Sequence, residues 1–268
     1  MKFIGLPQEL ETNLKKILVR RGDYSIWGKE HAKIVSDLKK YAKQFDITLN
    51  HEKLGSIRKV YMRDKYIRRF RILDSLIYKI SIEYDKTDIL VLSKKYDFPP
   101  LAMMRMILLD KGYSKDNVKK ITKDPTLLDN RDKEQFIKAI ENDYIGDFEQ
   151  DKITESANNF EREIEAFFDK KHIPYRTQAD LTRDQIQLIN RAVITPDLYF
   201  PQGVMIGGKK LYWIDAKNYY GGNASYVYNG VSKQADKYNK MYGYGGFIFK
   251  HGFSNALSDR VNAMFIEW

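Results

Sequence analysis

Apolar residues in the first half of the chain recur every three or four positions, which is the spacing of one buried face of an α-helix. Residues 29–45 and 53–71 both follow this spacing. We therefore expect an all-helical N-terminal region. In the helix that includes residues 53–71, the positions expected to be buried are Ile57, Val60, Tyr61, Ile67, Phe70 and Leu73. Eight basic residues against one acidic residue between Lys53 and Arg71 predict a cationic outer face, which is also typical of a helix that merely faces solvent.

Two shorter helical patterns follow around a pair of prolines. Thr87 can cap a helix that ends before Pro99 and Pro100, and a second helix is expected to stop at Gly112. Short helices joined by a tight turn are the parts of a helix-turn-helix, with residues 99–110 as the candidate recognition helix. The same pattern is typical of a plain helical hairpin, so both interpretations stay open.

The segment from Glu141 to Asp151 carries five acidic residues and no basic residue, and we place a domain boundary there. Beyond it come a helical pattern over 155–170, strand-like alternation, a polar helix over 232–241 and two late strands. This order describes a small α/β domain. The sequence therefore predicts a basic helical domain over residues 1–150 and an α/β domain over 151–268.

A two-residue hairpin is the clearest turn signal in the second half. Gly207 and Gly208 separate two apolar runs, and glycine suits the positive φ angles of such a turn. Folding back there would lay the strand that contains Asp197 beside the strand that contains Asp215. The two aspartates are then expected to share one metal ion.

The second of these strands ends on a charged pair. Side chains in a strand alternate between two faces, so Asp215 and Lys217 are expected on one face, and Ile214 and Ala216 on the other. Magnesium and manganese prefer oxygen ligands, and one or two carboxylates suffice beside waters and substrate phosphate. Asp197 is the second carboxylate, the Ala216 carbonyl is a further candidate ligand, and Lys217 can orient the attacking water or stabilise transition-state charge.

Other polar residues can complete such a site. Glu161 lies at the edge of an apolar helix stripe, where its carboxylate can lean towards the metal or simply face solvent. Gln234 and Tyr238 are four residues apart and share a helix face, so their amide and hydroxyl suit a phosphate or the leaving oxygen. Lys233 and Lys237 are expected to contact backbone phosphate or solvent.

Composition narrows the chemistry. The chain has no cysteine, and its four scattered histidines do not form a zinc-ligand spacing, so any metal must be held mainly by oxygen. No apolar run approaches the ~20 residues of a membrane span, and the first ten residues lack a signal-peptide pattern. We expect an intracellular protein, cytoplasmic or nuclear, that is neither secreted nor bound to a membrane.

The net charge of +10 is unevenly distributed. Residues 1–140 hold 31 Lys and Arg against 19 Asp and Glu, whereas residues 141–268 hold 15 against 17. Such a surplus favours a polyanion, although an acidic membrane or a merely soluble surface would also fit. The candidate nucleic-acid contacts are Arg58, Lys59, Arg63, Arg68, Arg69, Arg105, Lys233, Lys237 and Tyr238.

Five collinear motifs resemble the TPD-motif family of the PD-(D/E)XK nuclease superfamily: Phe160-Glu161-x-x-Ile164, Thr195-Pro196-Asp197, Trp213-Ile214-Asp215-Ala216-Lys217, Gln234-x-x-x-Tyr238 and Gly245-Gly246-Phe247-Ile248. The resemblance implies a helix-turn-helix region followed by a restriction-endonuclease-like domain, whose central mixed sheet is flanked by helices. It also implies that the catalytic residues are Glu161, Asp197, Asp215 and Lys217, with Gln234 in support. Asp215 stands where relatives often have glutamate.

These observations predict a Mg2+- or Mn2+-dependent endonuclease that hydrolyses phosphodiester bonds in DNA, with selectivity for branched or flap DNA as one option. A catalytically idle nuclease fold that binds nucleic acid or acts as a scaffold is an alternative. A ribonuclease is another, because backbone charge and metal chemistry serve DNA and RNA alike. The resemblance also implies a protein partner, and a homodimer stays open.

Overall fold

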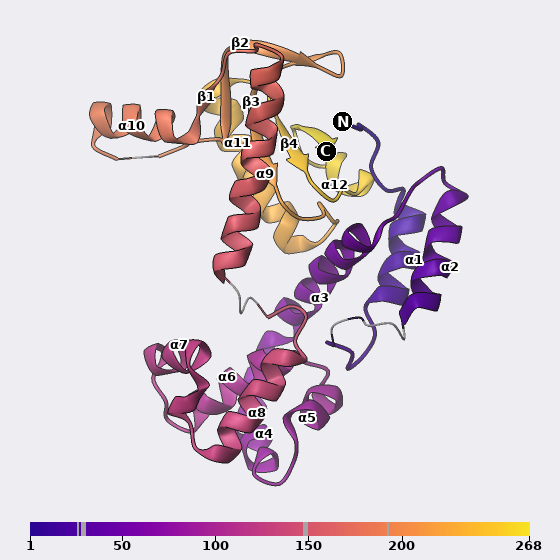
Figure 1. Ribbon diagram of the computed structural model, residues 1–268, viewed down its shortest axis with the longest axis vertical. Coiled ribbons are helices and arrows are strands. Elements are labelled where there is room, and N and C mark those ends of the chain that lie inside the picture. The colour runs from indigo at the N-terminus through magenta and orange to yellow at the C-terminus, as the bar shows by residue number, and fades with distance from the viewer. Residues whose placement is uncertain (26, 28–30, 147–149, 192) are drawn as a thin grey trace. The chain divides into compact units, whose positions relative to one another are not determined.

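The computed structural model describes residues 1–25, 27, 31–146, 150–191 and 193–268 (Figure 1). The elements follow along the chain as α1 (Gln8–Leu18), α2 (Ala32–Lys43), α3 (His51–Asp74), α4 (Ile77–Tyr84), α5 (Ile89–Tyr96), α6 (Pro100–Asp110), α7 (Lys115–Lys123), the 3-10 turn η2 (Pro125–Leu127), α8 (Asn130–Glu141), α9 (Gln150–Lys170), β1 (Arg176–Thr177), α10 (Gln178–Ile189), β2 (Leu198–Ile206), β3 (Lys209–Lys217), α11 (Ser225–Tyr242), β4 (Gly246–Phe249), α12 (Asn255–Ser258) and β5 (Met264–Glu267). The predicted helical N-terminal region and α/β second half are both confirmed.

The chain divides into two compact units. One unit contains residues 1–14, 38–60 and 151–268, and the other contains residues 15–37 and 61–150. The predicted boundary between residues 150 and 151 is one of the boundaries between the units, but residues 1–14 and 38–60 belong with 151–268, so this single cut does not describe the units fully. Of the segments discussed from the sequence, residues 29–30 of the first helical pattern and residues 147–149 of the acidic segment lie outside the described residues.

Within the described residues, five strands form one mixed sheet in the order β1-β2-β3-β4-β5. β1, β2 and β3 are antiparallel neighbours, whereas β3, β4 and β5 run parallel. Parallel neighbours need a crossover connection, and α11 supplies it between β3 and β4. This sheet and the helices that pack on it form the α/β domain predicted for the second half of the chain.

Helices cover both faces of this sheet. Phe160, Ile164 and Phe168 of α9 pack into one apolar cluster with Ile214 and Ile248 of the sheet. On the other face, aromatic residues of the sheet meet α11, and the ring of Trp213 lies 5.0 Å from the ring of Tyr238. Figure 1 shows α9 and α11 on either side of β2 and β3. This layering fixes which side chains of β3 can reach α11.

The helical unit is built around α6, which packs against α4, α5, α7 and α8. The predicted bounds of α5 and α6 are nearly right, although Asp88 rather than Thr87 caps α5 by accepting the N–H of Leu90 at 2.8 Å. Most of α6 is buried, including Met103, Met104 and Ile107. A recognition helix must present a long exposed face to a groove, so this packing does not support residues 99–110 in that role.

α3 differs from the predicted helix with one basic and one apolar face. Ile57 is buried as expected, but Ile67 is 45% exposed and Phe70 is 39% exposed. Conversely, Arg58 is only 1% exposed and Lys53 only 6%. Val60, Tyr61 and Leu73 are also buried as expected, so the periodicity gave the helix and most of its apolar face correctly but misassigned Ile67, Phe70 and the two buried cations.

The N-terminal segment packs into the unit that holds the sheet. The Glu11 carboxylate is buried and accepts hydrogen bonds from Tyr220 Oη at 2.8 Å and Ser254 Oγ at 2.6 Å. Lys2 and Glu267 exchange backbone hydrogen bonds, each 2.8 Å long. Residues near the start of the chain are thus part of the sheet unit. Among the described residues, no helix is both long and apolar enough to cross a membrane.

Candidate functional site

The predicted hairpin is present between β2 and β3. Ile206 pairs with Lys209, which leaves Gly207 and Gly208 as the two turn residues. Their φ angles are +55° and +77°, the left-handed conformations that glycine adopts at little cost. The Gly-Gly signal in the sequence was therefore read correctly.

The hairpin is not a regular ladder along its whole length. Near the turn, Val204 pairs with Leu211, and at the far end Leu198 pairs with Ile214. The register changes between Tyr199 and Val204, so β2 contains three more residues than β3 over this stretch. The extra residues form a bulge, which shifts the pairing and re-aims the strand.

This bulge brings the aspartates together. Asp197 directly precedes the far pair of the ladder and Asp215 directly follows it, so they face each other where β2 begins. Had β2 kept the register set at the turn, Asp197 would stand opposite Asn218. Pro201 and Gly203, which has a φ of +70°, lie within the bulge and were the sequence signal for it.

Asp215 is only 4% exposed and has two side-chain partners. Oδ1 forms an ion pair with Lys217 Nζ, and Oδ2 accepts a hydrogen bond from Tyr238 Oη at 3.1 Å. The predicted shared face of Asp215 and Lys217 is therefore confirmed. On the opposite face, Ile214 and Ala216 pack in the cluster that α9 covers.

Asp197 is held by the backbone around it. Its Oδ2 accepts the N–H of Ala216 at 2.6 Å, and its carbonyl accepts the N–H of Gln178 at 3.0 Å. Just upstream, the buried side chain of Gln185 accepts the N–H of Val193 at 2.7 Å and donates to the carbonyl of Ile194 at 2.7 Å. Gln185 thus ties α10 to the segment that leads into Asp197, a role not expected from the sequence.

Three carboxylates influence one another at this site. Burial raises the pKa of Asp197 to about 8, and the charges of Asp215 and then Glu161 add to the effect, while the Ala216 N–H opposes it. Burial likewise raises the pKa of Glu161, followed by repulsion from Asp215 and Glu165. The charges of Glu161 on α9 and of the two aspartates therefore influence one another, while the role of Glu161 as a metal ligand stays a prediction.

Lys217 is the cation of this cluster. Burial is the largest influence on its pKa and acts to lower it, but Asp215, Tyr219 and Asp197 together outweigh burial, and the net shift is upwards. Lys217 is therefore an ammonium at neutral pH. Its Nζ also lies 5.4 Å from the centre of the Phe247 ring, which adds a favourable cation–π contact.

The site has the donor chemistry of a hard divalent cation, although its acidic side chains are not tightly clustered. Throughout the described part of the chain, no three His, Cys, Asp or Glu side chains lie close enough together to hold a metal ion. Asp197 and Asp215 provide two carboxylates, which is fewer than the three side chains of such a group, and the Ala216 carbonyl is a further candidate oxygen ligand. Magnesium needs only one or two carboxylates. Because Lys217 offers one positive charge against three carboxylates, a cation would relieve the repulsion that raises the pKa of Asp197.

α11 places Gln234 and Tyr238 on one face, as their spacing predicted. The Gln234 side chain hydrogen-bonds Tyr238, and this bond partly offsets the increase in the Tyr238 pKa that burial and then Asp215 cause. Tyr238 is buried and donates to Asp215. The sequence predicted that Tyr238 contacts nucleic acid, but its hydroxyl instead contacts Asp215 inside the site.

The proposed nucleic-acid contacts fall into different environments. Arg58 is buried and cannot serve as an outer-surface contact, which corrects that prediction. Arg68 pairs with Asp64 at 2.6 Å, and Arg69 donates to the Tyr96 carbonyl at 3.0 Å. Lys59 is partly buried, Lys233 and Lys237 are exposed on α11, and Arg63 and Arg105 line a cavity of the helical unit.

Comparison with known protein families finds a match to the second half of the chain. The family model described as "Protein of unknown function TPD sequence-motif" matches residues 128–267, which include Thr195-Pro196-Asp197. An uncharacterized protein of Acanthamoeba polyphaga mimivirus is 29% identical over 131 residues, which cover 47% of this chain and 45% of the viral protein. The alignment thus spans less than half of that relative, and no solved structure matches the chain. Because the family model covers more than half of the sequence, the chain belongs to the TPD sequence-motif family.

Proposed function

We propose that this protein is a divalent-metal-dependent endonuclease of the PD-(D/E)XK superfamily that hydrolyses phosphodiester bonds in DNA. The observation that carries the proposal is the meeting of Asp197, Asp215 and Lys217 across a bulged hairpin, with Glu161 close enough to influence the Asp197 pKa. Buried ionisable groups with a strongly shifted pKa, as at Asp197, are typical of functional sites. A purely structural ion pair would need only Asp215 and Lys217.

Asp197 and Asp215 would hold Mg2+ or Mn2+, with the Ala216 carbonyl and Glu161 as further ligands. When bound, such an ion neutralises phosphate charge and makes a water molecule acidic enough to act as a nucleophile near neutral pH. Lys217 is protonated, so it is suited to stabilise the charge that develops on the phosphate, and not to act as a base. Tyr238 and Gln234 orient Asp215 through a chain of hydrogen bonds.

The basic charge of the first half supports a nucleic-acid substrate, since residues 1–140 carry most of the excess Lys and Arg. The exposed lysines Lys233 and Lys237 lie on α11, the helix that also carries Tyr238 of the site. They would bind backbone phosphate near the scissile bond. We infer DNA as the substrate, with branched and flap forms as the structures to compare.

A panel of labelled substrates tests the proposal. Single-stranded, duplex, flap and four-way-junction DNA, with matching RNA, are incubated with the protein in Mg2+ or Mn2+ and in EDTA. We expect metal-dependent cutting of DNA that Asp215→Asn and Lys217→Ala abolish, while Asp236→Asn, an exposed change on α11, cuts like wild type. No cutting of any substrate would favour an idle scaffold, and cutting of RNA alone would favour a ribonuclease.

A further inference from the structure

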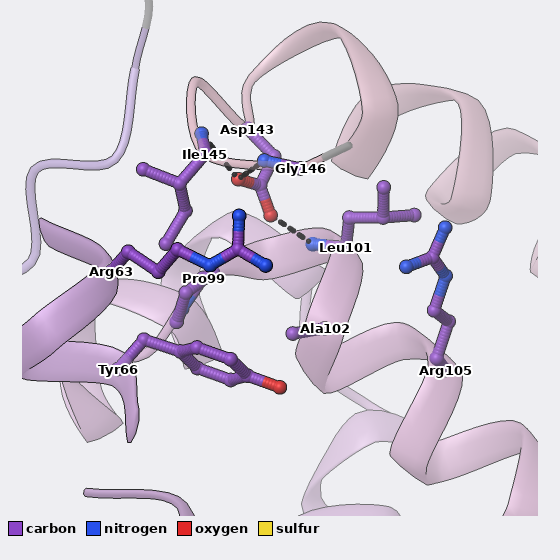
Figure 2. Close-up of a pocket in the computed structure, with 9 residues that line it drawn as sticks. All are labelled: Arg63, Tyr66, Pro99, Leu101, Ala102, Arg105, Asp143, Ile145 and Gly146. Carbon is purple, nitrogen blue, oxygen red and sulfur yellow. Dashed lines mark hydrogen bonds between the residues drawn. The ribbon is translucent and has the colours of Figure 1, made fainter. Parts of the chain in front are cut away.

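The helical unit contains a cavity of about 200 Å³ whose lining combines two arginines with apolar residues and one aspartate (Figure 2). Arg63 and Tyr66 come from α3, and Arg105 comes from α6. Figure 2 shows that the two guanidinium groups approach the cavity from different helices. The remaining lining residues are Pro99, Leu101, Ala102, Asp143, Ile145 and Gly146.

The two arginines are 42 positions apart in the sequence, and folding brings them to one cavity. Arg63 and Tyr66 are three residues apart on one helix, so they share a face of α3. Their charges reach the phenol: burial raises the Tyr66 pKa, while Arg105 and Arg63 act to lower it. Because the net shift is upwards, Tyr66 is a hydroxyl donor at neutral pH.

Asp143 is the acidic residue of this lining, and backbone donors satisfy it. Its carboxylate accepts the N–H groups of Leu101 at 2.9 Å, Ile145 at 3.0 Å and Gly146 at 2.8 Å. Its role is therefore to tie the start of α6 to the segment that follows α8. With two arginines against one carboxylate, the lining retains a net positive charge.

Size and shape restrict the ligand. Pockets for small organic ligands usually measure about 300–1,000 Å³, so this cavity suits a group smaller than a nucleotide. The Tyr66 ring already makes edge contacts with Phe70 and Phe98, at centroid distances of 6.0 and 5.1 Å. The polar group that Tyr66 offers to a ligand in the cavity is its hydroxyl. Arginine forks match the oxygens of phosphate and bind them in pairs.

We propose that this cavity binds a single phosphate group of a nucleic-acid strand through Arg63, Arg105 and the Tyr66 hydroxyl. The choice of nucleic acid as the source of the phosphate rests on the proposed function, whereas the anion site itself rests on the lining. Both arginines also have interactions within the protein. The phosphate therefore shares their donors with existing partners. The site would anchor the strand at the helical unit, separately from the acidic site that cuts it.

Binding measured in EDTA tests this site without cleavage. Fluorescence anisotropy follows a labelled single-stranded oligonucleotide with a 5′-phosphate, the same strand with a 5′-hydroxyl, and competition by inorganic phosphate. The variants are Arg63→Ala, Arg105→Lys and Tyr66→Phe in the full-length protein. Arg71→Ala is the matched control, because it removes one exposed charge from α3 outside the cavity. Melting temperatures identify any variant that fails to fold.

We expect Arg63→Ala to weaken binding by about tenfold, the range for a charged hydrogen bond, and Arg71→Ala by less than about twofold, as for an exposed charge. Arg105→Lys and Tyr66→Phe should weaken it with unchanged melting temperature. A loss confined to the 5′-phosphorylated strand identifies a terminal phosphate, and an equal loss on both strands identifies an internal one. The proposal is wrong if folded cavity variants bind both strands as Arg71→Ala does. If the cavity variants lose binding but wild type cuts no substrate, the phosphate site stands and the proposed nuclease activity is refuted.

Discussion

The carboxylate of Asp197 accepts a 2.6 Å hydrogen bond from the backbone N–H of Ala216, the residue between Asp215 and Lys217. This bond links the residue just before β2 to the charged end of β3, so the two acidic side chains cannot separate without breaking it. A protein hydrogen bond without a charged partner contributes about 0.5–1.5 kcal/mol, and the raised pKa keeps Asp197 largely uncharged at neutral pH. The site is therefore assembled before any cation or substrate arrives.

The raised pKa of Asp197 predicts how stability responds to pH and metal. With a pKa that rises from 3.8 to about 8, the folded protein keeps a proton that the unfolded chain has released. Stability should therefore fall as the pH rises from about 4 to about 8. A bound cation replaces this proton, so Mg2+ should raise the melting temperature most at the upper end of this range.

Thermal unfolding of wild type and Asp197→Asn, each in EDTA and in Mg2+, measures this effect. The amide cannot ionise, so the variant should lose less stability over the same pH range and should respond little to Mg2+. Parallel pH curves for the two proteins, or an equal response to Mg2+, would show that Asp197 is not the group responsible.

The bulge predicts that Gly203 matters more to the site than the turn glycines do. A Cβ at Gly203 would lie 2.5 Å from Lys210 Cε, and its φ of +70° is unfavourable for alanine. Gly208 has a similar φ of +77° but open space around it, so Gly208→Ala is the matched control. Each change should cost about 1–2 kcal/mol through its left-handed backbone. We expect only Gly203→Ala to weaken the Mg2+-induced rise in melting temperature, and the reverse pattern would contradict the account.

Tyr238 should act as a positioning residue for Asp215. Tyr238→Phe keeps the ring beside Trp213, at 5.0 Å, but removes the hydroxyl that donates to Asp215. Loss of a partner that orients a metal ligand costs about 10- to 100-fold in activity or metal affinity, so we expect slower cleavage and weaker Mn2+ binding with little change in melting temperature. Tyr228→Phe, on the same helix, is the control. Unchanged Mn2+ affinity in Tyr238→Phe would argue against this role.

Glu11 should stabilise the sheet unit although it lies 165 residues before Arg176, the first residue of the sheet. Glu11→Ala leaves Tyr220 and Ser254 without their buried acceptor, at a cost of about 1–3 kcal/mol. Glu9→Ala changes an exposed residue of the same helix and should have little effect. Chemical denaturation measures both variants, and a fragment of residues 151–268 should unfold at lower denaturant than the full chain. Equal stability of all these proteins would disprove the packing role of the N-terminal segment.

Local signals in the sequence predicted the parts of the structure that depend on near neighbours. The Gly207-Gly208 turn and the shared face of Asp215 and Lys217 follow from backbone geometry over a few residues, and both are present. The bulge was not predicted, because the hairpin signal places the two strands side by side but does not give the register along their whole length. Pro201 and Gly203 were its signal, since neither residue suits a regular strand.

Long-range packing could not be predicted in the same way. The helical period over residues 53–71 shows that a helix forms, but it does not show which face another segment will cover. Arg58 is consequently buried and Ile67 exposed, against the expectation. For the same reason, the sequence did not predict that α6 lies at the centre of its unit or that Glu11 accepts a hydrogen bond from Tyr220.

The most direct test of the central claim is the Mn2+-dependent cleavage rate of labelled four-way-junction, flap and duplex DNA by wild type, Asp197→Asn and Asp236→Asn at equal concentration. We expect wild type and Asp236→Asn to cut at the same rate, Asp197→Asn to be slower by at least about 100-fold, and EDTA to stop all cutting. Equal cutting by Asp197→Asn, or cutting that persists in EDTA, would contradict a metal site built on Asp197 and Asp215.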